Sequence, residues 1–406
     1  MGWFSMSAKP IGPDSGLQLL VDDGYRVEIR HQHLLLHDVP YVTASRQIDR
    51  GTLICTYVKS GEAILVPDNH QVWWTGEYPC YASGAPIEQL RNEDQAKELF
   101  PECFIRHRFS NKPDGLSNFS DHYTKLVHYV TIIQSQAQVI NPVVNARGEK
   151  KEVTSDDDNS PFMYADSASA RAEIQAISNR LALKRVAIVG VGGTGAYILD
   201  QVAKTPVAEI HLFDGDSFLQ HNAFRAPGAA SEKEIADAPN KAEFYKRKYE
   251  VMHRGIVSHP HHLDKTNIDE LVDFDFAFIC VDHGATRRLL FERLLERHIP
   301  FIDVGLSLHQ VRSTGKLVGS CRFTLCTPEQ NVHADQFAPM EDDEPDAIYH
   351  QNIQIADMNA LNAQLAVMRW KQYFGFYQDD FNTHNCTFSV NTMSLVRDVL
   401  VVKPET

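Results

Sequence analysis

The sequence is poor in cysteine and has no clustered cysteines. Its 406 residues include seven cysteines, an odd number, at widely separated positions. A disulfide framework is typical of small secreted chains with an even, closely spaced set of cysteines. We therefore expect free thiols in a reducing compartment, and the cytoplasm fits best.

Long hydrophobic runs and an excess of positive charge are also missing. No apolar stretch approaches the length of a membrane span, and residues 1–10 lack both a signal-peptide core and the Ser or Thr at position 6 that myristoylation needs. Asp and Glu outnumber Lys and Arg by 53 to 39, so the formal net charge is −14. Nucleic acids and anionic membranes attract basic proteins, so neither is an expected partner, whereas a basic protein partner is compatible.

The length and hydrophobic content predict two domains. A chain of 406 residues is too long for one ordinary core, and 43% of its residues are hydrophobic, which is enough to fill two cores. Residues 1–15 are small and polar and are predicted to be a mobile leader. Residues 145–160 are charged and nearly free of apolar side chains, which is typical of a linker. This places an N-terminal domain at residues 16–144 and a second domain at 161–406.

The N-terminal domain is predicted to be a smaller α+β domain. Strand-like runs cover residues 25–37, 52–58 and 71–74, with Asp, Gly and Pro turns between them. In residues 122–140, apolar side chains recur every three or four positions, which predicts a helix with one buried face. The residues of that face are Tyr123, Leu126, Val130, Ile133 and Ala137. Strands followed by a helix indicate the α+β class.

The second domain is predicted to be α/β, because strands and helices alternate through residue 303 in a doubly wound pattern. Its parallel sheet should be buried on both faces. One helix with a stripe running from Ala170 to Leu181 is expected before the first strand. Another helix is expected at residues 352–374, with Met358, Leu361, Leu365 and Met368 on one face.

The clearest functional pattern lies in residues 185–225. An apolar run at residues 185–190, typical of a buried parallel strand, leads without a gap into Gly190, Gly192, Gly193 and Gly195. Glycines let the backbone approach a phosphate closely, and the helix expected near Thr194 would direct its free N–H groups at the anion. Taken alone, the glycines are equally compatible with a simple tight turn.

Residues further along the chain favour a nucleotide triphosphate. Asp214 follows a second apolar run roughly 20 residues after the glycines, where a dinucleotide fold places the carboxylate that binds a ribose hydroxyl. Asn222, Arg225 and Lys241 come next, and a later apolar run ends at Asp282. Two cations suit a triphosphate, and an aspartate at the end of a strand can bind magnesium. Hydride transfer to nicotinamide would need neither the triphosphate-binding cations nor the magnesium.

The ordered set of these residues resembles the ThiF, MoeB and ubiquitin-activating superfamily. The resemblance covers roughly residue 164 to the C-terminus and implies a Rossmann-like ThiF adenylation domain that uses ATP and Mg²⁺ on the C-terminal glycine of a ubiquitin-like protein. It implies that Asp214 binds the ribose and Asp282 the magnesium, and that the triphosphate is held by Asn222, Arg225 and Lys241. It also implies a homodimer. His283 departs from the family, which often has Asn or Asp there, and the Cys-x-x-Cys pairs of zinc-binding members are absent.

The same resemblance implies one more arginine. Members of the superfamily donate an arginine across the dimer from a helix before the first strand. Arg171 is the candidate and Arg180 the alternative. A solvated helix residue is an equally reasonable interpretation of either.

A thiolate is the usual acceptor of an acyl adenylate in ubiquitin-like transfer. Cys386 is the first candidate and Cys326 and Cys80 are alternatives, because all three have loop or edge contexts that a nucleophile would need. His384, two residues before Cys386, would help to lower the pKa of that thiol if the side chains met. The thiolate belongs either to this chain or to a partner.

Three histidines flank Pro260, at positions 259, 261 and 262. Their spacing matches no familiar zinc pattern. A polar turn around the proline is therefore the preferred interpretation.

Several phrases resemble a narrower group, the BilD-type activating enzymes of bacterial ubiquitin-like (Bil antiphage) conjugation operons. They are residues 24–42, 76–80, 203–218 and 221–229. This resemblance implies three partners: a ubiquitin-like protein, a ubiquitin-conjugating-like enzyme and a deconjugating protease.

These observations lead to one functional hypothesis and two alternatives. The chain is expected to be a ubiquitin-like-protein activating enzyme that passes its product on as a thioester, in bacterial antiphage defence. One alternative is a biosynthetic adenylyltransferase that serves a sulfur-carrier protein. The other is an inactive ThiF-like binding partner, although such proteins usually lose the arginine, lysine or aspartate that this chain keeps.

Overall fold

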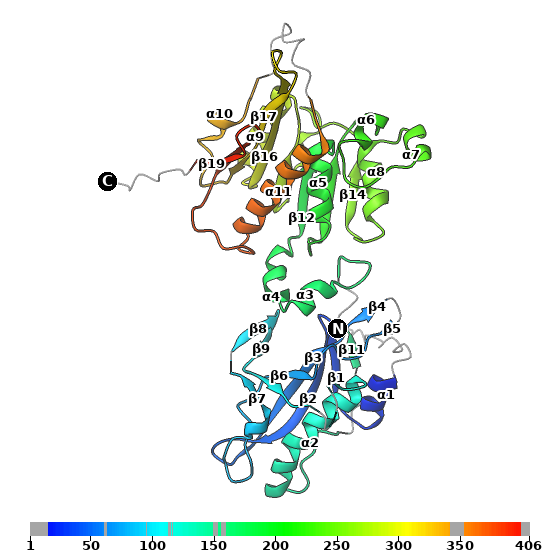
Figure 1. Ribbon diagram of the computed structural model, residues 1–406, viewed down its shortest axis with the longest axis vertical. Helices are drawn as coiled ribbons and strands as arrows, with labels where there is room; N and C mark the ends of the chain where they lie inside the picture. Colours follow the sequence, from blue (N-terminus) through cyan, green and yellow to red (C-terminus); the bar gives the residue numbers. More distant parts are fainter. Residues whose placement is uncertain are drawn as a thin grey trace, which may run out of the picture. The chain divides into compact units, whose positions relative to one another are not determined.

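A computed structural model of the chain shows two compact units, each built around its own sheet (Figure 1). The structure describes residues 15–60, 63–94, 96–112, 115, 117–148, 153–155, 160–341 and 353–398. The N-terminal unit comprises Met1–Ser160 and Tyr164–Asn179, and the C-terminal unit comprises Pro161–Met163 and Arg180–Thr406. Residues 1–14 of the predicted leader lie outside the described residues. Within the described ranges, no helix is both long and apolar enough to cross a membrane.

A seven-stranded sheet forms the centre of the N-terminal unit, in the order β11-β1-β2-β3-β6-β10-β7. The strands are β1 (Val27–Arg30), β2 (His33–Val42), β3 (Ile48–Thr56), β6 (Gln71–Trp74), β7 (Arg91–Glu93), β10 (His107–Ser110) and β11 (Val153–Ser155). Two hairpins lie outside this sheet, β4 (Lys59–Ser60) with β5 (Ala63–Ile64) and β8 (Lys97–Phe100) with β9 (Cys103–Ile105). The short elements are α1 (Ser15–Asp22), η1 (Glu88–Leu90), α3 (Ser167–Arg171) and α4 (Gln175–Ser178).

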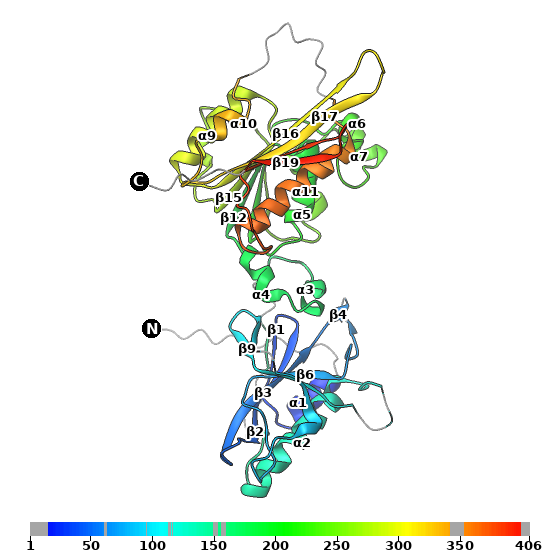
Figure 2. The same ribbon diagram turned by 60° about the vertical axis from the view of Figure 1, so that its left-hand side comes forward.

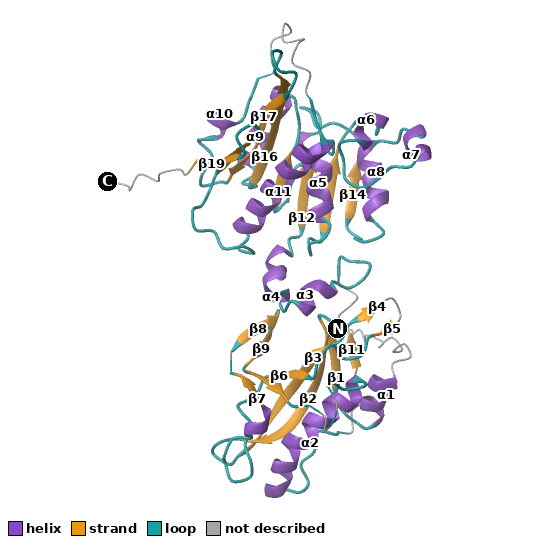
Figure 3. Ribbon diagram, in the orientation of Figure 1, coloured by secondary structure: helices purple, strands orange, loops and turns teal. Residues whose placement is uncertain are grey.

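The long helix α2 (His122–Ile140) has the bounds that the sequence pattern predicts. It begins at Asp121, whose side chain accepts a hydrogen bond from the Thr124 backbone N–H at 2.7 Å, as an N-cap should. Leu126, Val130 and Ile133 are buried against the sheet, as the spacing predicts. Figure 3 shows this helix beside the strands of its unit, so the predicted α+β character of the N-terminal domain is confirmed.

The predicted linker contains regular structure. Val153–Ser155 forms β11, which pairs in parallel with β1 at the edge of the sheet. Charged composition favours solvation of the side chains, but an edge strand needs only its backbone groups to pair. The domain limits drawn from composition remain predictions.

The C-terminal unit contains an eight-stranded sheet in the order β14-β13-β12-β15-β16-β17-β18-β19. The strands are β12 (Arg185–Val189), β13 (Glu209–Phe213), β14 (Ile256–His259), β15 (Phe276–Ile279), β16 (Phe301–Gln310), β17 (Leu317–Cys326), β18 (Asn385–Ser389) and β19 (Ser394–Asp398). Within this unit, strands β12 to β16 pair in parallel, and strands β17 to β19 are added in antiparallel pairs. The predicted doubly wound α/β fold is therefore confirmed.

Helices cover both faces of this sheet, as Figure 2 shows with α9 and α10 on one side and α5 and α11 on the other. The helices are α5 (Gly193–Val202), α6 (Gln220–Ala223), α7 (Glu232–Ala236), α8 (Lys241–Tyr249), α9 (Gly284–Glu296), α10 (Ala334–Phe337) and α11 (Ala356–Tyr373), with the short turns η3 (Asn179–Leu181) and η4 (Ile268–Glu270). Along β12, Val186 and Ile188 join one core cluster, whereas Ala187 and Val189 join the other. A strand buried on both faces must be apolar at every position, which explains the continuous hydrophobic run.

Two helix predictions need correction. The single helix expected to carry Ala170 and Leu181 is broken into α3, α4 and η3, and Glu173 between them has a φ of 56°. A left-handed residue cannot continue a right-handed helix. In α11 the buried face carries Ala366 and Trp370, whereas Met368 is 43% exposed. Small side chains on its buried face let α11 pack closely on α5. Hydrophobicity alone does not predict which face of the helix is buried.

The strand order reverses next to β12. From β12 the chain moves outward through β13 to β14, then returns to pair β15 on the other side of β12. In open α/β sheets such a reversal separates the loops at the carboxyl ends of the two central strands and leaves room for a ligand.

Candidate functional site

A cleft of about 960 Å³ opens at this reversal point. It is bordered by the loops after β12, β13 and β15, by parts of β16 and β17 and by α11. Ligand pockets commonly measure about 300–1,000 Å³, so the cleft is large enough for a nucleotide. The site residues predicted from the sequence that line it are Gly190, Gly192, Gly193, Asp214, Arg225, Lys241 and Asp282.

The glycines of the loop serve different purposes. Gly190 has a φ of +87°, and a Cβ there would lie 2.7 Å from the carbonyl oxygen of Cys280. A Cβ at Gly195 would lie 1.9 Å from the carbonyl oxygen of Gly190, so this glycine, which does not line the cleft, permits close packing of helix on strand. A Cβ at Gly192 would meet nothing within 4 Å. Gly192 is therefore the position where the open space of the cleft reaches the backbone.

Gly192 is also the N-cap residue of α5, and no side chain among the described residues caps that end. The first N–H groups of a helix lack intrahelical partners and carry partial positive charge. Because the cleft lies at this helix end, it presents backbone donors suited to an anion.

Asp214 is buried at the carboxyl end of β13, with 6% of its surface exposed. Its carboxylate accepts backbone hydrogen bonds from Val191 at 2.8 Å and from Asp216 at 2.9 Å, so it joins the glycine loop to its own loop. Burial raises the pKa of Asp214, and the nearby Lys241 ammonium partly offsets this. The orientation of the carboxylate is thus fixed by the backbone.

Lys241 lies between two carboxylates. Its Nζ is 2.7 Å from Asp216 Oδ2 and 4.0 Å from Asp214 Oδ1, and the residue is 7% exposed. The hydrogen bond from Lys241 lowers the pKa of Asp216. The sequence interpretation did not include Asp216, although it lies only two residues from Asp214 and borders the same cleft.

Two donors near the glycine loop have no partner among the described residues. The Nε of Arg225 and the Nδ2 of Asn222 are both buried without a hydrogen bond. Asn222 does not line the cleft, and its Oδ1 accepts from the Leu219 backbone N–H at 2.8 Å. Buried donors without acceptors are costly. Arg225 as a whole residue also lines the cleft, so its guanidinium group is placed to meet an anionic ligand.

Asn359 on α11 connects the glycine loop to the segment of Arg225. It is 1% exposed, its Oδ1 accepts from the Thr194 hydroxyl at 2.9 Å, and its Nδ2 donates to the Arg225 carbonyl oxygen at 3.4 Å. A Cβ on Gly193 would lie 2.3 Å from Nδ2 of Asn359. No local motif in α11 marks this asparagine, so sequence reasoning missed it.

Asp282 projects from the loop after β15, and 67% of its side chain is exposed. Its Oδ1 lies 3.8 Å from Nε2 of His283, which is also exposed. Carboxylate oxygens are the ligands that Mg²⁺ prefers, and the position of Asp282 on the cleft wall leaves its oxygens accessible.

A buried ion network supports this loop. Asp303 in β16 is fully buried and accepts hydrogen bonds from Arg287 at 2.9 Å and from Arg322 at 2.7 Å. Arg287 also donates to the carbonyl oxygens of Val281 and Pro339. It therefore anchors the residue directly before Asp282.

Arg171 and Arg180 do not line the cleft. Arg171 ends α3 in the N-terminal unit and is exposed. Arg180 donates through Nη1 to the Gly375 carbonyl oxygen within the C-terminal unit. Donation of Arg171 across a dimer stays a prediction.

The candidate cysteines are in environments that oppose a thiolate. Cys386 lies in β18, is 3% exposed and belongs to the core cluster around α11, and burial raises its pKa to about 11. The expected help from His384 is absent, because its Nδ1 lies 3.3 Å from the Leu325 carbonyl oxygen instead. Burial also raises the pKa of Cys326 to about 12 and the pKa of Cys80. The loop or edge context inferred for Cys386 is therefore wrong, because β18 is paired on both sides. Cys326 does lie directly before the loop, as the last residue of β17, but it is buried.

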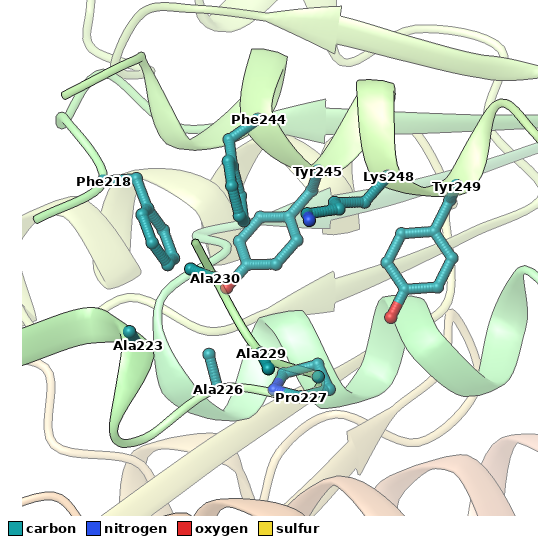
Figure 4. A pocket seen from close by; sticks show the side chains of 11 residues that line it. Phe218, Ala223, Ala226, Pro227, Ala229, Ala230, Phe244, Tyr245, Lys248 and Tyr249 are labelled. Carbon is teal, nitrogen blue, oxygen red and sulfur yellow. The ribbon is translucent and has the colours of Figure 1, made fainter. Parts of the chain in front are cut away.

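A second, smaller pocket of about 230 Å³ lies beside α8 (Figure 4). The rings of Phe218 and Phe244 stack with centroids 4.0 Å apart, and Tyr245 and Tyr249 extend the aromatic wall. Figure 4 shows the segment with Pro227 opposite these rings. Its lining includes none of the predicted nucleotide residues, so the larger cleft is the candidate active site.

Several solved structures are similar to part of this chain. The crystal structure of E. coli MccB with succinimide is 17% identical, with a TM-score of 0.46, and the match covers 59% of this chain and 73% of that chain. The complex of E. coli MccB with ATP has the same identity, TM-score and coverage. A selenomethionine structure of PaaA is 17% identical with a TM-score of 0.44, covering 55% of this chain and 75% of that chain. No curated protein matches the chain.

Family models match both the N-terminal and the C-terminal part of the sequence. Residues 15–167 match a domain of unknown function, DUF6791. Residues 164–397, more than half of the chain, match the ThiF family, and the protein belongs to that family.

Proposed function

We propose that the protein is an ATP- and Mg²⁺-dependent adenylating enzyme that activates the C-terminal glycine of a ubiquitin-like protein. The observation that carries this proposal is the convergence of the glycine loop, Asp214, Arg225, Lys241 and Asp282 on one cleft. Membership of the ThiF family supports it. The partner set, the role in bacterial antiphage defence and the homodimer rest on the sequence resemblance. Action in the cytoplasm rests on the number and scattered positions of the cysteines.

The proposed binding mode follows from the charges in the cleft. The ribose would bind Asp214, and the phosphates would bind the N-terminus of α5 beside Gly192. Arg225, which lines the cleft, would donate from its guanidinium group to a phosphate oxygen. Lys241 would exchange part of its contact with Asp216 for the triphosphate, because a triphosphate carries more negative charge than one carboxylate.

The proposed reaction is displacement at phosphorus. A carboxylate oxygen of the substrate glycine attacks the α-phosphorus, the bond from that phosphorus to the bridging oxygen breaks, and pyrophosphate leaves. The products are an acyl adenylate and pyrophosphate. Arg225 and Lys241 would stabilise the negative charge that builds on the phosphates. A magnesium ion on Asp282 would supply further neutralisation.

Capture of the acyl adenylate needs a thiolate. Because Cys386, Cys326 and Cys80 are buried with raised pKa values, we propose that a partner supplies it, and a ubiquitin-conjugating-like enzyme is the candidate. The thiolate attacks the acyl carbon, a thioester bond forms, and AMP leaves. Of the acceptors that the sequence left open, namely Cys386, Cys326, Cys80 or a thiol of a partner, this proposal takes the thiol of a partner.

ATP–pyrophosphate exchange tests the proposal. The full chain is incubated with ATP, Mg²⁺, labelled pyrophosphate and the ubiquitin-like protein of its operon, and labelled ATP is measured. Exchange should require the intact C-terminal glycine of the substrate. Lys241→Ala should lower exchange by about 100-fold or more, since removal of one preorganised donor to a developing negative charge costs about 2.7–4 kcal/mol in other enzymes.

Arg247→Ala is the matched control, because Arg247 is an exposed cation on the same helix α8. It should retain exchange. If the wild-type chain neither binds ATP in calorimetric titration nor catalyses exchange, it is an inactive binding partner. If exchange works and the product is a thiocarboxylate on a sulfur carrier, the biosynthetic alternative is correct.

A further inference from the structure

A cluster of two histidines and one glutamate lies at the edge strand of the C-terminal sheet. His259 is the last residue of β14, His261 follows Pro260, and Glu270 ends η4. One ligand atom from each residue lies within 4.8 Å of the other two. Neither the ThiF assignment nor the proposed adenylation uses these residues.

The separations suit a single metal ion. Glu270 Oε2 lies 3.5 Å from Nδ1 of His259 and 3.1 Å from Nε2 of His261. Two ligands each about 2.1 Å from a tetrahedral zinc lie about 3.4 Å apart. The three groups therefore need only small rotations to coordinate one ion.

A hydrogen-bond relay behind His259 fixes the direction of its lone pair. Arg185 Nε donates to Glu209 Oε2 at 2.9 Å, and the same carboxylate oxygen lies 3.2 Å from His211 Nε2. A carboxylate accepts, so His211 carries its proton on Nε2 and uses Nδ1 as an acceptor. His211 Nδ1 lies 2.9 Å from His259 Nε2, which must therefore be the donor.

The consequence is an electrostatic conflict at the other nitrogen. With its proton on Nε2, neutral His259 points the Nδ1 lone pair toward the Glu270 carboxylate, which also carries only lone pairs. A cation between Nδ1 and the carboxylate resolves the conflict.

Aromatic packing and a tight turn hold the ligands in place. The His259 ring stacks on Phe213 with centroids 4.1 Å apart, and Phe274 meets the edge of His211 at 5.0 Å. The His261 backbone N–H donates to the His259 carbonyl oxygen at 2.9 Å, which closes a three-residue turn around Pro260. Metal sites need such support, because histidine ligands are commonly oriented by a hydrogen bond on the second ring nitrogen.

We propose that His259, His261 and Glu270 bind a divalent transition metal of the Zn²⁺ type, with water as the fourth ligand. Two imidazoles and one carboxylate are a known zinc ligand set. The polar turn predicted from the sequence is present, and it also presents two ligands. By joining β14 to η4, the ion fixes the intervening loop, whose His262 and Leu263 line the candidate active site.

Metal titration of the full chain tests this site. Protein without a histidine tag is treated with a chelator, and Zn²⁺ alone is titrated by calorimetry and by competition with a chromophoric chelator. We expect one ion per chain. His261→Ala and Glu270→Gln should each weaken binding by more than about 10–100-fold, the loss typical of removing a mere supporting residue. Both residues are partly exposed, so both variants should fold.

His262→Ala is the matched control, because His262 is the adjacent histidine and is not among the ligands. It should keep the Zn²⁺ affinity within about threefold, because surface substitutions outside a site usually have small effects. Co²⁺ substituted into the site should give the intense visible bands of a four-coordinate ion, and Glu270→Gln should lose them. Binding that is weak and non-stoichiometric, or that falls equally in His262→Ala, overturns the proposal. Neither outcome depends on ATP, so the proposed adenylation is tested separately.

Discussion

Substitution of Arg287 by methionine should destabilise the C-terminal unit strongly. The side chain is 4% exposed, it donates to the fully buried Asp303, and it also satisfies the carbonyl oxygens of Val281 and Pro339. Methionine keeps most of the apolar stem but removes every donor. Loss of one partner from a buried ion pair typically costs about 3–5 kcal/mol.

The expected loss lies at the lower end of that range. Arg322 remains 2.7 Å from Asp303, so the carboxylate keeps one cationic partner. A loss of about 3 kcal/mol is still a large part of the roughly 5–15 kcal/mol that stabilises a typical domain. With a urea slope of about 3 kcal/mol/M, the unfolding midpoint should fall by about 1 M.

Urea unfolding followed by circular dichroism measures this effect. The two units are fitted as separate transitions, because a two-unit chain need not unfold in a single step. Arg288→Met is the matched control: Arg288 is the next residue and is half-exposed, and its ion pair among the described residues, with Glu341, is long at 3.8 Å. It should change stability by less than about 0.5 kcal/mol. Equal midpoints for the two variants would refute the reasoning that the Arg287–Asp303 network supports this unit.

Three further predictions concern the cleft and the cysteines. Asp282→Asn should reduce ATP–pyrophosphate exchange by at least about 100-fold, since a lost metal ligand costs several kcal/mol. The melting temperature should stay unchanged, because the side chain is 67% exposed. A fully active variant would exclude the metal role. Gly192→Ala should weaken ATP binding in calorimetry but preserve the fold. Gly195→Ala should lower the melting temperature sharply, because the Cβ of the alanine would lie 1.9 Å from a backbone oxygen. The reverse pattern would contradict the roles assigned to the two glycines. Burial raises the pKa of Cys386 from 9.0 to about 11, so the stability that its protonated thiol contributes is complete below pH 9 and is lost as the pH rises through 11. Mass spectrometry after iodoacetamide treatment at pH 8 should find Cys386 unmodified in native protein and modified in urea. Rapid labelling of the native protein would instead show that the thiol is accessible.

Local pattern was sufficient for the main elements of the fold. The apolar run before Gly190 predicts a strand buried on both faces, and the structure confirms it in β12. The spacing in residues 122–140 predicts helix α2 at its observed bounds. These predictions succeed because strand and helix periods depend on neighbours within a few positions.

The same locality explains the errors. Buried faces depend on which neighbour packs against a helix, so Ala366 is buried in α11 while the more hydrophobic Met368 is exposed. Cys386 sits in a short polar segment of the sequence, yet pairing of β18 with β17 places its thiol in the core. The hydrophobicity of a residue and its neighbours in the chain can be read from the sequence, whereas its burial depends on which other helices and strands pack against it.

The candidate site divides in the same way. Order along the chain was enough to predict the glycine loop, Asp214, Arg225, Lys241 and Asp282 as site candidates, because each follows a recognisable strand or keeps a fixed order. Only the tertiary structure revealed Asn359, which meets Thr194 across 165 residues, and the relay from Glu209 through His211 to His259. Side-chain contacts between distant segments arise from the packing of whole helices and strands. A local sequence pattern in one segment therefore does not identify its contact partner on the other segment.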